Sequence, residues 1–250
     1  MSDTPKDEHA ASLEKWARAG KEGLPPVLAA TVILLRDGES GLETLMLRRN
    51  SKIVFGGMWV FPGGRVDPED WEGIEEGDDF AASRCAAVRE SVEECCLRID
   101  PDTMLAFSHW TPPPVTPKRF LTWFFVARPL SGSVRIDDGE IKESAWMSPA
   151  EALRRQSVQE IELAPPTYVT LSELSTFSNV DEALTRVAAR EPERFETHIG
   201  VGESGPIALW HGDAGYASSD PSMTGPLHRL TMVKGGQWRY ERSGEARFGG

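Results

Sequence analysis

The sequence has few basic residues, few cysteines and no long apolar run. Its 27 lysines and arginines are outnumbered by 39 aspartates and glutamates, so the 250-residue chain has a formal net charge of −12 and a pI near 5.0. A surface of this sign repels phosphate backbones and acidic lipids, which excludes broad binding to a nucleic-acid polymer or to an acidic membrane. An anionic ligand must then be held locally, by a metal ion or by clustered arginines.

The three cysteines do not form a disulfide framework. Cys85, Cys95 and Cys96 all fall in one predicted helix, where Cys85 and Cys95 would lie about 15 Å apart along the axis. We therefore expect a reducing compartment and a core-filling role for the adjacent pair. The N-terminus shows no apolar signal segment, and no apolar run approaches membrane-spanning length, so we expect a cytoplasmic protein without a membrane partner.

Two apolar runs near the start of the chain predict a β-hairpin. Residues 27–35 form a continuous apolar run rich in β-branched side chains, residues 42–47 form a second run, and two glycines lie between them. A short third strand is expected over 58–61, ended by the turn Pro62-Gly63-Gly64. Residues 1–22 are polar and are expected to form a loose tail or a short helix.

The most regular helical pattern begins near Asp78 and Asp79, whose carboxylates suit a helix N-terminus. Apolar residues recur at helical spacing and should face the core, namely Ala81, Cys85, Val88, Val92, Cys95 and Ile99. Glu90, Glu93 and Glu94 stand at i, i+3 and i+4, which places them on one face, opposite that stripe and within reach of one cation.

Further strands and helices are expected up to Arg190. The strands are expected at 103–110, 119–127, 134–136 and 141–146, and a proline-rich loop separates the first two. The helices are expected at 149–155, with Ser148 as N-cap, at 168–177 and at 180–189. Beyond Arg190 the chain is rich in glycine and proline, which predicts an irregular β extension.

Residues 63–97 resemble the Nudix box, whose usual pattern is G-x5-E-x7-R-E-U-x-E-E-x-G-U with U aliphatic. The match consists of the glycine turn that follows Phe61 and Pro62 and of a later acidic group, namely Arg89, Glu90, Glu93 and Glu94. The resemblance implies an α/β fold, a Nudix-like α/β/α sandwich with a mixed β-sheet. It further implies an N-terminal tail or short helix over 1–22, a hydrolase domain over 23–190 and a C-terminal extension over 191–250 packed on that domain.

The box departs from the pattern at four places. Asp70 stands where the first Glu is usual, and Arg89 follows 11 residues later than the pattern asks, which indicates an insertion at about 68–79. Extra loop length there costs little entropy, so turn and helix can still meet. Ser91 and Cys96 occupy an aliphatic and a glycine position; a positive φ at Cys96 would cost about 1 kcal/mol, and we expect the helix to run on to Ile99 instead.

The metal-binding role of the box follows from the resemblance. Glu90, Glu93 and Glu94 would bind Mg²⁺, or Mn²⁺ in its place, Gly63 would offer its backbone carbonyl to the same ion, and Arg89 would orient a glutamate, for which pairing with Glu93 is the expected contact. The chemistry agrees, because Mg²⁺ prefers oxygen ligands and three crowded carboxylates repel one another unless a cation joins them. The alternative is a solvated acidic helix face.

The general base and the phosphate-binding residues are open. The base is either a box glutamate or an acidic residue of a later turn, for which the candidates are Asp137, Asp138, Glu140 and Glu143; of these Glu140 is our choice. Two basic clusters could clamp phosphates or be ordinary surface charges, namely Arg48, Arg49 and Lys52, and Lys118 with Arg119. His109 and Trp110 could border the site or fill the core.

Four passages of the chain resemble one branch of the superfamily, the bacterial relatives of peroxisomal acyl-CoA diphosphatases with an insertion in the box: VFPGGRVDPED, HWTPPPVTPKRFLTWFFVA, AWMSPAEAL and APPTYVTLSEL. This implies Mg²⁺-dependent hydrolysis of a small-molecule nucleoside diphosphate derivative, with coenzyme A or acyl-CoA as best guess and NADH or a sugar nucleotide as alternatives. A catalytically weak, ligand-binding regulator and a scaffold without a site are the alternatives of another class. A homodimer is expected by resemblance alone.

Overall fold

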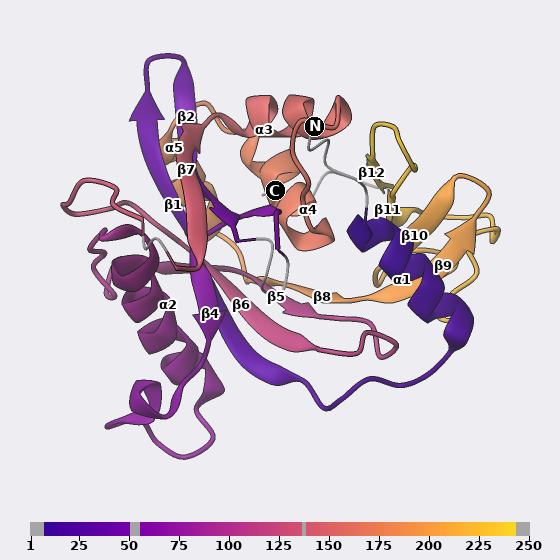
Figure 1. Cartoon of the computed structure of the whole chain (residues 1–250), viewed down its shortest axis with the longest axis horizontal. Coiled ribbons are helices and arrows are strands. Elements are labelled where there is room, and N and C mark those ends of the chain that lie inside the picture. Colours follow the sequence, from indigo (N-terminus) through magenta and orange to yellow (C-terminus); the bar gives the residue numbers. More distant parts are fainter. Residues whose placement is uncertain (1–7, 51–55, 137–138, 244–250) are drawn as a thin grey trace.

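A mixed β-sheet forms the centre of the computed structural model, which describes residues 8–50, 56–136 and 139–243 (Figure 1). The strands of this sheet are β1 (Val27–Gly38), β2 (Gly41–Arg49), β3 (Trp59–Val60), β4 (Gly63–Arg65), β5 (Leu105–Thr111), β6 (Phe120–Ala127), β7 (Ile141–Met147) and β8 (Glu193–Glu196). Their order is β3-β2-β1-β6-β5-β8, and β4 pairs with β1 while β7 pairs with β2. The β1–β6 and β5–β8 pairs are parallel and the others antiparallel, which confirms the expected mixed sheet.

Helices cover both faces of this sheet. Helix α2 (Asp79–Cys95) packs on one face, and α3 (Pro149–Ser157), α4 (Pro165–Leu174) and α5 (Val180–Ala188) lie on the other (Figure 1). Alternate residues of β1 serve the two layers, as strand geometry requires. Val32 packs in the core beneath α2, whereas Ile33 packs in the core that includes the other helices. The α/β/α sandwich is therefore confirmed.

The glycines of the predicted turn belong to a strand. Gly63–Arg65 forms β4 and pairs with Ala29–Thr31 of β1, so the chain turns at Phe61 and Pro62 instead. The structure has no strand at 134–136; there the Arg135 amide donates to the Cys95 carbonyl at 3.1 Å. Helix α4 begins at Pro165, earlier than expected, because proline is compatible with the first turn of a helix.

The predicted core stripe of α2 is only partly right: Cys95 and Ile99 are buried and Val88 packs against the core, but the rest of the stripe is not buried. Val92 is 43% exposed and Cys85 is also exposed, whereas the buried face consists of Ala82, Ser83, Ala86, Ala87, Ser91, Glu94 and Cys95. Small side chains let the helix approach β1 and β4 closely. Glu94 therefore lies on the buried side of the helix and not opposite to it, as the apolar periodicity had predicted.

The chain beyond Arg190 first completes the main sheet with β8 and then forms a second, antiparallel sheet. Its strands are β9 (His198–Gly202), β10 (Gly205–Leu209), β11 (His228–Thr231) and β12 (Arg239–Arg242), in the order β12-β11-β10-β9. Helix α1 (Glu8–Ala19), which falls in the predicted N-terminal segment, packs on β9 and β10. Residues 210–227 are a long irregular connection, and Trp210 and Trp238 share a buried cluster with α4.

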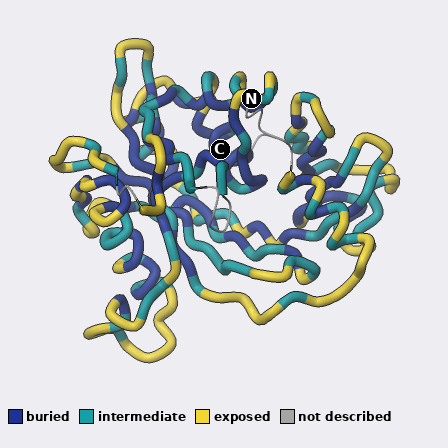
Figure 2. The backbone as a smooth tube through the Cα atoms, viewed as in Figure 1, coloured by how far each residue is buried: buried dark blue, intermediate teal, exposed yellow. Residues whose placement is uncertain are grey.

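Buried residues are concentrated in the strands and in the helices that cover them, while the tip of the β1–β2 hairpin is exposed (Figure 2). Among the described residues, no helix has the length and apolar character needed to cross a bilayer.

Candidate active site

The residues that flank α2, Asp78 and Cys96, define its two ends. The Asp78 carboxylate accepts a hydrogen bond from the Ala81 amide at 3.0 Å, which confirms the expected start of the helix. At the other end Cys96 has φ 57, so the helix stops there and the expectation that it continues to Ile99 is wrong. Ser91, in place of an aliphatic residue, is fully buried, and its hydroxyl donates to the Leu97 carbonyl at 2.8 Å. Ser91 therefore secures the chain reversal after the helix.

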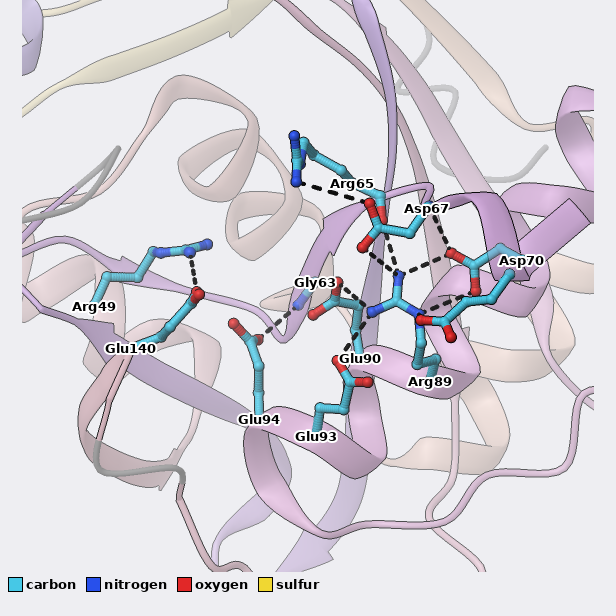
Figure 3. Close-up of polar contacts among 11 residues, drawn as sticks. Arg49, Gly63, Arg65, Asp67, Asp70, Arg89, Glu90, Glu93, Glu94 and Glu140 are labelled. Carbon is cyan, nitrogen blue, oxygen red and sulfur yellow. Dashed lines mark hydrogen bonds and ion pairs between the residues drawn. The ribbon is translucent and has the colours of Figure 1, made fainter.

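The glycine strand β4 and the carboxylates of α2 meet despite the insertion between them (Figure 3). The Gly63 amide donates to Glu94 Oε2 at 2.9 Å. A Cβ atom on Gly64 would lie 2.1 Å from Glu90 Oε1, so any side chain there would displace that carboxylate. The two glycines are needed for different reasons: a side chain on Gly63 would meet the Ala30 carbonyl and Thr31 of β1, and one on Gly64 would meet Glu90.

Arg89 gathers carboxylates from both halves of the box. Its Nε and Nη2 donate to the two oxygens of Asp70 at 3.1 and 2.8 Å, and Nη2 also donates to the Arg65 carbonyl at 3.0 Å. Its Nη1 donates to Glu90 and Glu93, each at 2.9 Å, so the predicted Arg89–Glu93 pair is confirmed. The sequence pattern placed Asp70 at a box position but predicted no partner for it. Its retained spacing from Gly64 was the signal that could have marked it as the partner of Arg89.

The box carboxylates differ in their environments. Glu94 is 4% exposed, and burial raises its pKa to about 7, although the Gly63 amide and the positive charge of Arg49 oppose that rise. Burial also raises the pKa of Glu90, against the lowering effect of Arg89. Glu93 is exposed. Negative charge on Glu90 and Glu94 is therefore costly unless a cation joins them.

The donor set fits a hard divalent cation. Glu90 Oε1, Glu93 Oε2 and Glu94 Oε2 are engaged in the contacts above, and within the described ranges no hydrogen bond involves the second oxygen of each. Carboxylate oxygens are the ligands that Mg²⁺ and Mn²⁺ prefer. In the described residues, no three His, Cys, Asp or Glu side chains converge closely enough to bind one metal ion. Arg89 instead pairs with Glu90 and Glu93, and the Gly63 amide donates to Glu94.

A second wall of the site comes from the pairing of β2 with β7. Arg49 Nη2 donates to Glu140 at 2.9 Å, and Arg48 Nη1 donates to Glu143 at 3.0 Å, so the predicted phosphate clamp and the predicted base neighbour each other. Arg49 and Glu140 both influence the charge of Glu94, which places this pair beside the box (Figure 3). The other candidates on these loops, Lys52, Asp137 and Asp138, lie outside the described residues.

The second basic cluster does not join the glutamates. Lys118 and Arg119 precede β6, where Phe120 pairs with Val27 of β1, whereas Gly63 pairs with Thr31. Those four residues of β1 correspond to roughly 13 Å along the strand. Arg119 Nη2 donates to the Pro112 carbonyl at 3.2 Å.

His109 and Trp110 point to opposite faces of β5. Trp110 is buried and stacks on Phe195 at 3.9 Å, which makes it a core residue. His109 is half-buried, and its ring centroid lies 4.4 Å from that of Trp123.

Comparison with known proteins agrees with this geometry. A family model described as the NUDIX domain matches residues 25–166. The crystal structure of a NUDIX hydrolase from Alicyclobacillus acidocaldarius has the same fold, with a TM-score of 0.57 at 24% identity over 64% of this chain and 96% of that one.

Two curated relatives carry the name acyl-coenzyme A diphosphatase NUDT19. The Gallus gallus protein is 37% identical over 99 residues, which are 38% of this chain and 26% of the relative. The Xenopus laevis protein is 30% identical over 130 residues, which are 48% of this chain and 33% of the relative. The matched parts thus span a third or less of these relatives. Because the NUDIX match covers more than half of the sequence and includes the turn and helix described above, this chain belongs to the NUDIX family.

Proposed function

We propose that this protein is a Mg²⁺-dependent hydrolase that cleaves the diphosphate linkage of a nucleoside diphosphate derivative. The observation that carries the proposal is the contact between the two halves of the box. Glu94 accepts a hydrogen bond from Gly63, and Glu90 occupies the space above Gly64, although the insertion separates turn and helix in the sequence.

Each residue of the box has a role in this proposal. Glu90, Glu93 and Glu94, with the Gly63 carbonyl, would hold Mg²⁺, or Mn²⁺ in its place, and Arg89 would orient Glu93. The bound cation supplies charge neutralisation on the diphosphate and acidification of water. Water oxygen bonds to one phosphorus, the bridging P–O bond breaks, and the leaving phosphate keeps the electron pair. The products are a nucleotide and a phosphorylated remainder.

Glu140 is the proposed general base, and Arg48 and Arg49 are proposed to bind phosphate. The support is position, since Arg49 and Glu140 lie next to Glu94, and the Arg49 Nε is buried with no hydrogen-bond partner among the described residues. Lys118 and Arg119 precede β6, next to the start of β1 and about 13 Å along that strand from Gly63, so their proposed role is limited to a distal part of a long substrate.

Coenzyme A or an acyl-CoA is the proposed substrate. Both curated relatives are named acyl-coenzyme A diphosphatases, and coenzyme A combines a nucleotide, a diphosphate and a long arm. NADH and sugar nucleotides are the alternatives. The three free cysteines support a reducing compartment such as the cytoplasm.

The test is a substrate panel of coenzyme A, an acyl-CoA, NADH and a sugar nucleotide, assayed with Mg²⁺ for cleavage products. We expect wild-type protein to cleave the coenzyme A compounds fastest and Glu94→Gln to lose activity by about 10²-fold or more, because it removes a ligand of the cation. Glu72→Gln, on an exposed glutamate of the insertion, is the matched control and should stay within about twofold. Tight binding of one compound without turnover of any would replace the enzyme by a ligand-binding regulator.

The role of Glu140 has its own matched control in the neighbouring ion pair. Glu140→Gln should lower kcat by about 10²-fold if this residue takes the proton from water. Glu143→Gln breaks the Arg48 pair on the same strands and should leave kcat nearly unchanged. Equal effects of the two substitutions would move the base to a box glutamate.

A further inference from the structure

The guanidinium of Arg89 has more carboxylates around it than it can hydrogen-bond. Its five N–H groups already serve Asp70, the Arg65 carbonyl, Glu90 and Glu93. Two further carboxylates lie in ion-pair range without a hydrogen bond: Asp67 Oδ2 is 3.9 Å from Nη2 and Glu69 Oε1 is 3.8 Å from Nε. Both follow the glycine strand in the sequence. They lie nearest Nη2 and Nε, whereas Glu90 and Glu93 are held by Nη1 (Figure 3 shows Asp67 near Arg89).

The contacts of Arg89 divide by nitrogen atom. Nη1 alone holds Glu90 and Glu93, while Nε and Nη2 hold Asp70. A divalent cation that binds Glu90 and Glu93 therefore competes with a single nitrogen of the arginine. The positive charge left behind must then be balanced by the carboxylates near Nε and Nη2, because Arg89 is only 17% exposed in its side chain and is poorly screened by solvent.

We propose that Asp67 and Glu69 are positioning residues that hold the Arg89 guanidinium toward Asp70 and thereby set the affinity of the box for a divalent cation. With both present, Nη1 can give up Glu90 and Glu93 while the guanidinium stays neutralised. Without them, Asp70 is left to share the neutralisation of this charge with the two glutamates that the cation needs, which then hold Nη1 more tightly. This inference depends on the proposed function, because it assumes that the box glutamates bind the cation.

The anchoring of Asp67 supports a fixed position for this second set. The Asp67 amide donates to Asp70 Oδ2 at 2.9 Å, at the start of the 3-10 helix Pro68–Trp71. Asp67 Oδ1 also lies 3.8 Å from Arg65 Nη2. Asp70, in turn, is 5% exposed, so the carboxylate that carries Arg89 is itself held in place.

The experiment measures Mn²⁺ binding to the full chain by electron paramagnetic resonance, without substrate. The variant Asp67→Asn/Glu69→Gln keeps the shapes of both side chains and removes both charges; we expect its dissociation constant to rise about fivefold. The variant Glu72→Gln/Glu75→Gln changes the net charge equally at exposed insertion residues that are not among the ion-pair partners of Arg89. Its dissociation constant should change by less than about twofold. The single variant Glu69→Gln, on an exposed side chain, should give about a twofold rise and replaces the double variant if that one does not fold.

If Asp67 and Glu69 served only to stabilise the fold, their replacement would also lower kcat. At saturating Mg²⁺ we expect kcat of the Asp67→Asn/Glu69→Gln variant to stay within about twofold of wild type, since neither residue is proposed to touch the substrate. An unchanged or tighter dissociation constant, or one that rises equally in the control, overturns the inference. If wild type binds Mn²⁺ and cleaves diphosphates while that result is obtained, only the inference fails; if wild type does neither, the proposed function fails with it.

Discussion

Two buried carboxylates in this molecule, Asp213 and Glu94, have pKa values shifted in opposite directions. Asp213, in the connection between β10 and β11, accepts hydrogen bonds from the amides of Gly215 and His228 and from two nitrogens of Arg229, at 2.6 to 2.8 Å. Burial raises the pKa of Asp213, but these donors outweigh it and the net pKa is lower than usual. Glu94, equally buried, accepts one backbone hydrogen bond, and its pKa rises to about 7.

The two carboxylates differ in how far the protein itself neutralises their charge, and this difference agrees with the proposed role of Glu94 as a cation ligand. The negative charge of Asp213 is neutralised by hydrogen-bond donors of the protein itself, so it requires no ligand. Glu94 is not, and its neighbours Glu90 and Glu140 add to the repulsion. An incompletely neutralised buried charge destabilises the fold, and proteins tolerate this mainly where a bound ligand completes the neutralisation.

Removal of Asp213 should have the largest effect on stability. Asp213→Ala leaves the guanidinium of Arg229, which is 7% exposed, without its carboxylate, and the free energy of unfolding should fall by about 3–5 kcal/mol. Urea denaturation measures this. Glu203→Ala, on an exposed residue between β9 and β10, should change it by less than about 0.5 kcal/mol. A loss of under 1 kcal/mol in Asp213→Ala would contradict the contrast drawn above.

Replacement of Glu94 should have the opposite sign, and only at high pH. Because the folded pKa of about 7 exceeds the ordinary value of 4.5, the stability associated with this carboxyl is fully present below pH 4.5 and is lost as pH rises through 7. In EDTA at pH 8, Glu94→Gln should therefore be more stable than wild type by roughly 1–3 kcal/mol, with no difference near pH 4. Parallel pH profiles of the two proteins in urea denaturation would show that Glu94 is as well neutralised as Asp213.

The smallest effect concerns the backbone next to the site. Strand β10 begins with a glycine at a positive φ, Gly205, whereas α2 ends on Cys96 with φ 57. Cys96→Gly should raise the free energy of unfolding by about 0.5–1 kcal/mol, since glycine adopts this conformation without strain. Cys96→Ala keeps the strain and should gain nothing. A gain of the same size in Cys96→Ala would assign the effect to the thiol.

Local signals predicted much of the fold because they act within a few residues. The β1–β2 hairpin, the Asp78 cap of α2 and the Ser148 cap of α3, where Ser148 Oγ accepts from the Glu151 amide at 3.2 Å, all depend on near neighbours in the sequence. The buried face of α2 was not predictable in this way. Hydrophobic periodicity favours Cys85 and Val92, which are exposed, whereas a helix that lies close to a sheet buries small residues such as Ala82.

The site was predicted as far as the box pattern reaches. The pattern identified the three glutamates, Arg89 and the glycine turn, whose contacts the structure then describes. It could not show that Arg49 pairs with Glu140, because that contact depends on the register of β2 against β7, strands that are far apart in the sequence. The metal, substrate and catalytic roles of these residues stay predictions.

The position of β8 has a consequence for synthesis. A ribosome makes β5 long before residues 193–196, yet β8 is the strand that covers the edge of β5 and brings Phe195 onto Trp110. Until that segment emerges, the nascent sheet has an open edge beside an unstacked tryptophan, which is a surface that invites pairing with other chains. The last strand of the main sheet thus also covers an edge at which other chains could otherwise pair.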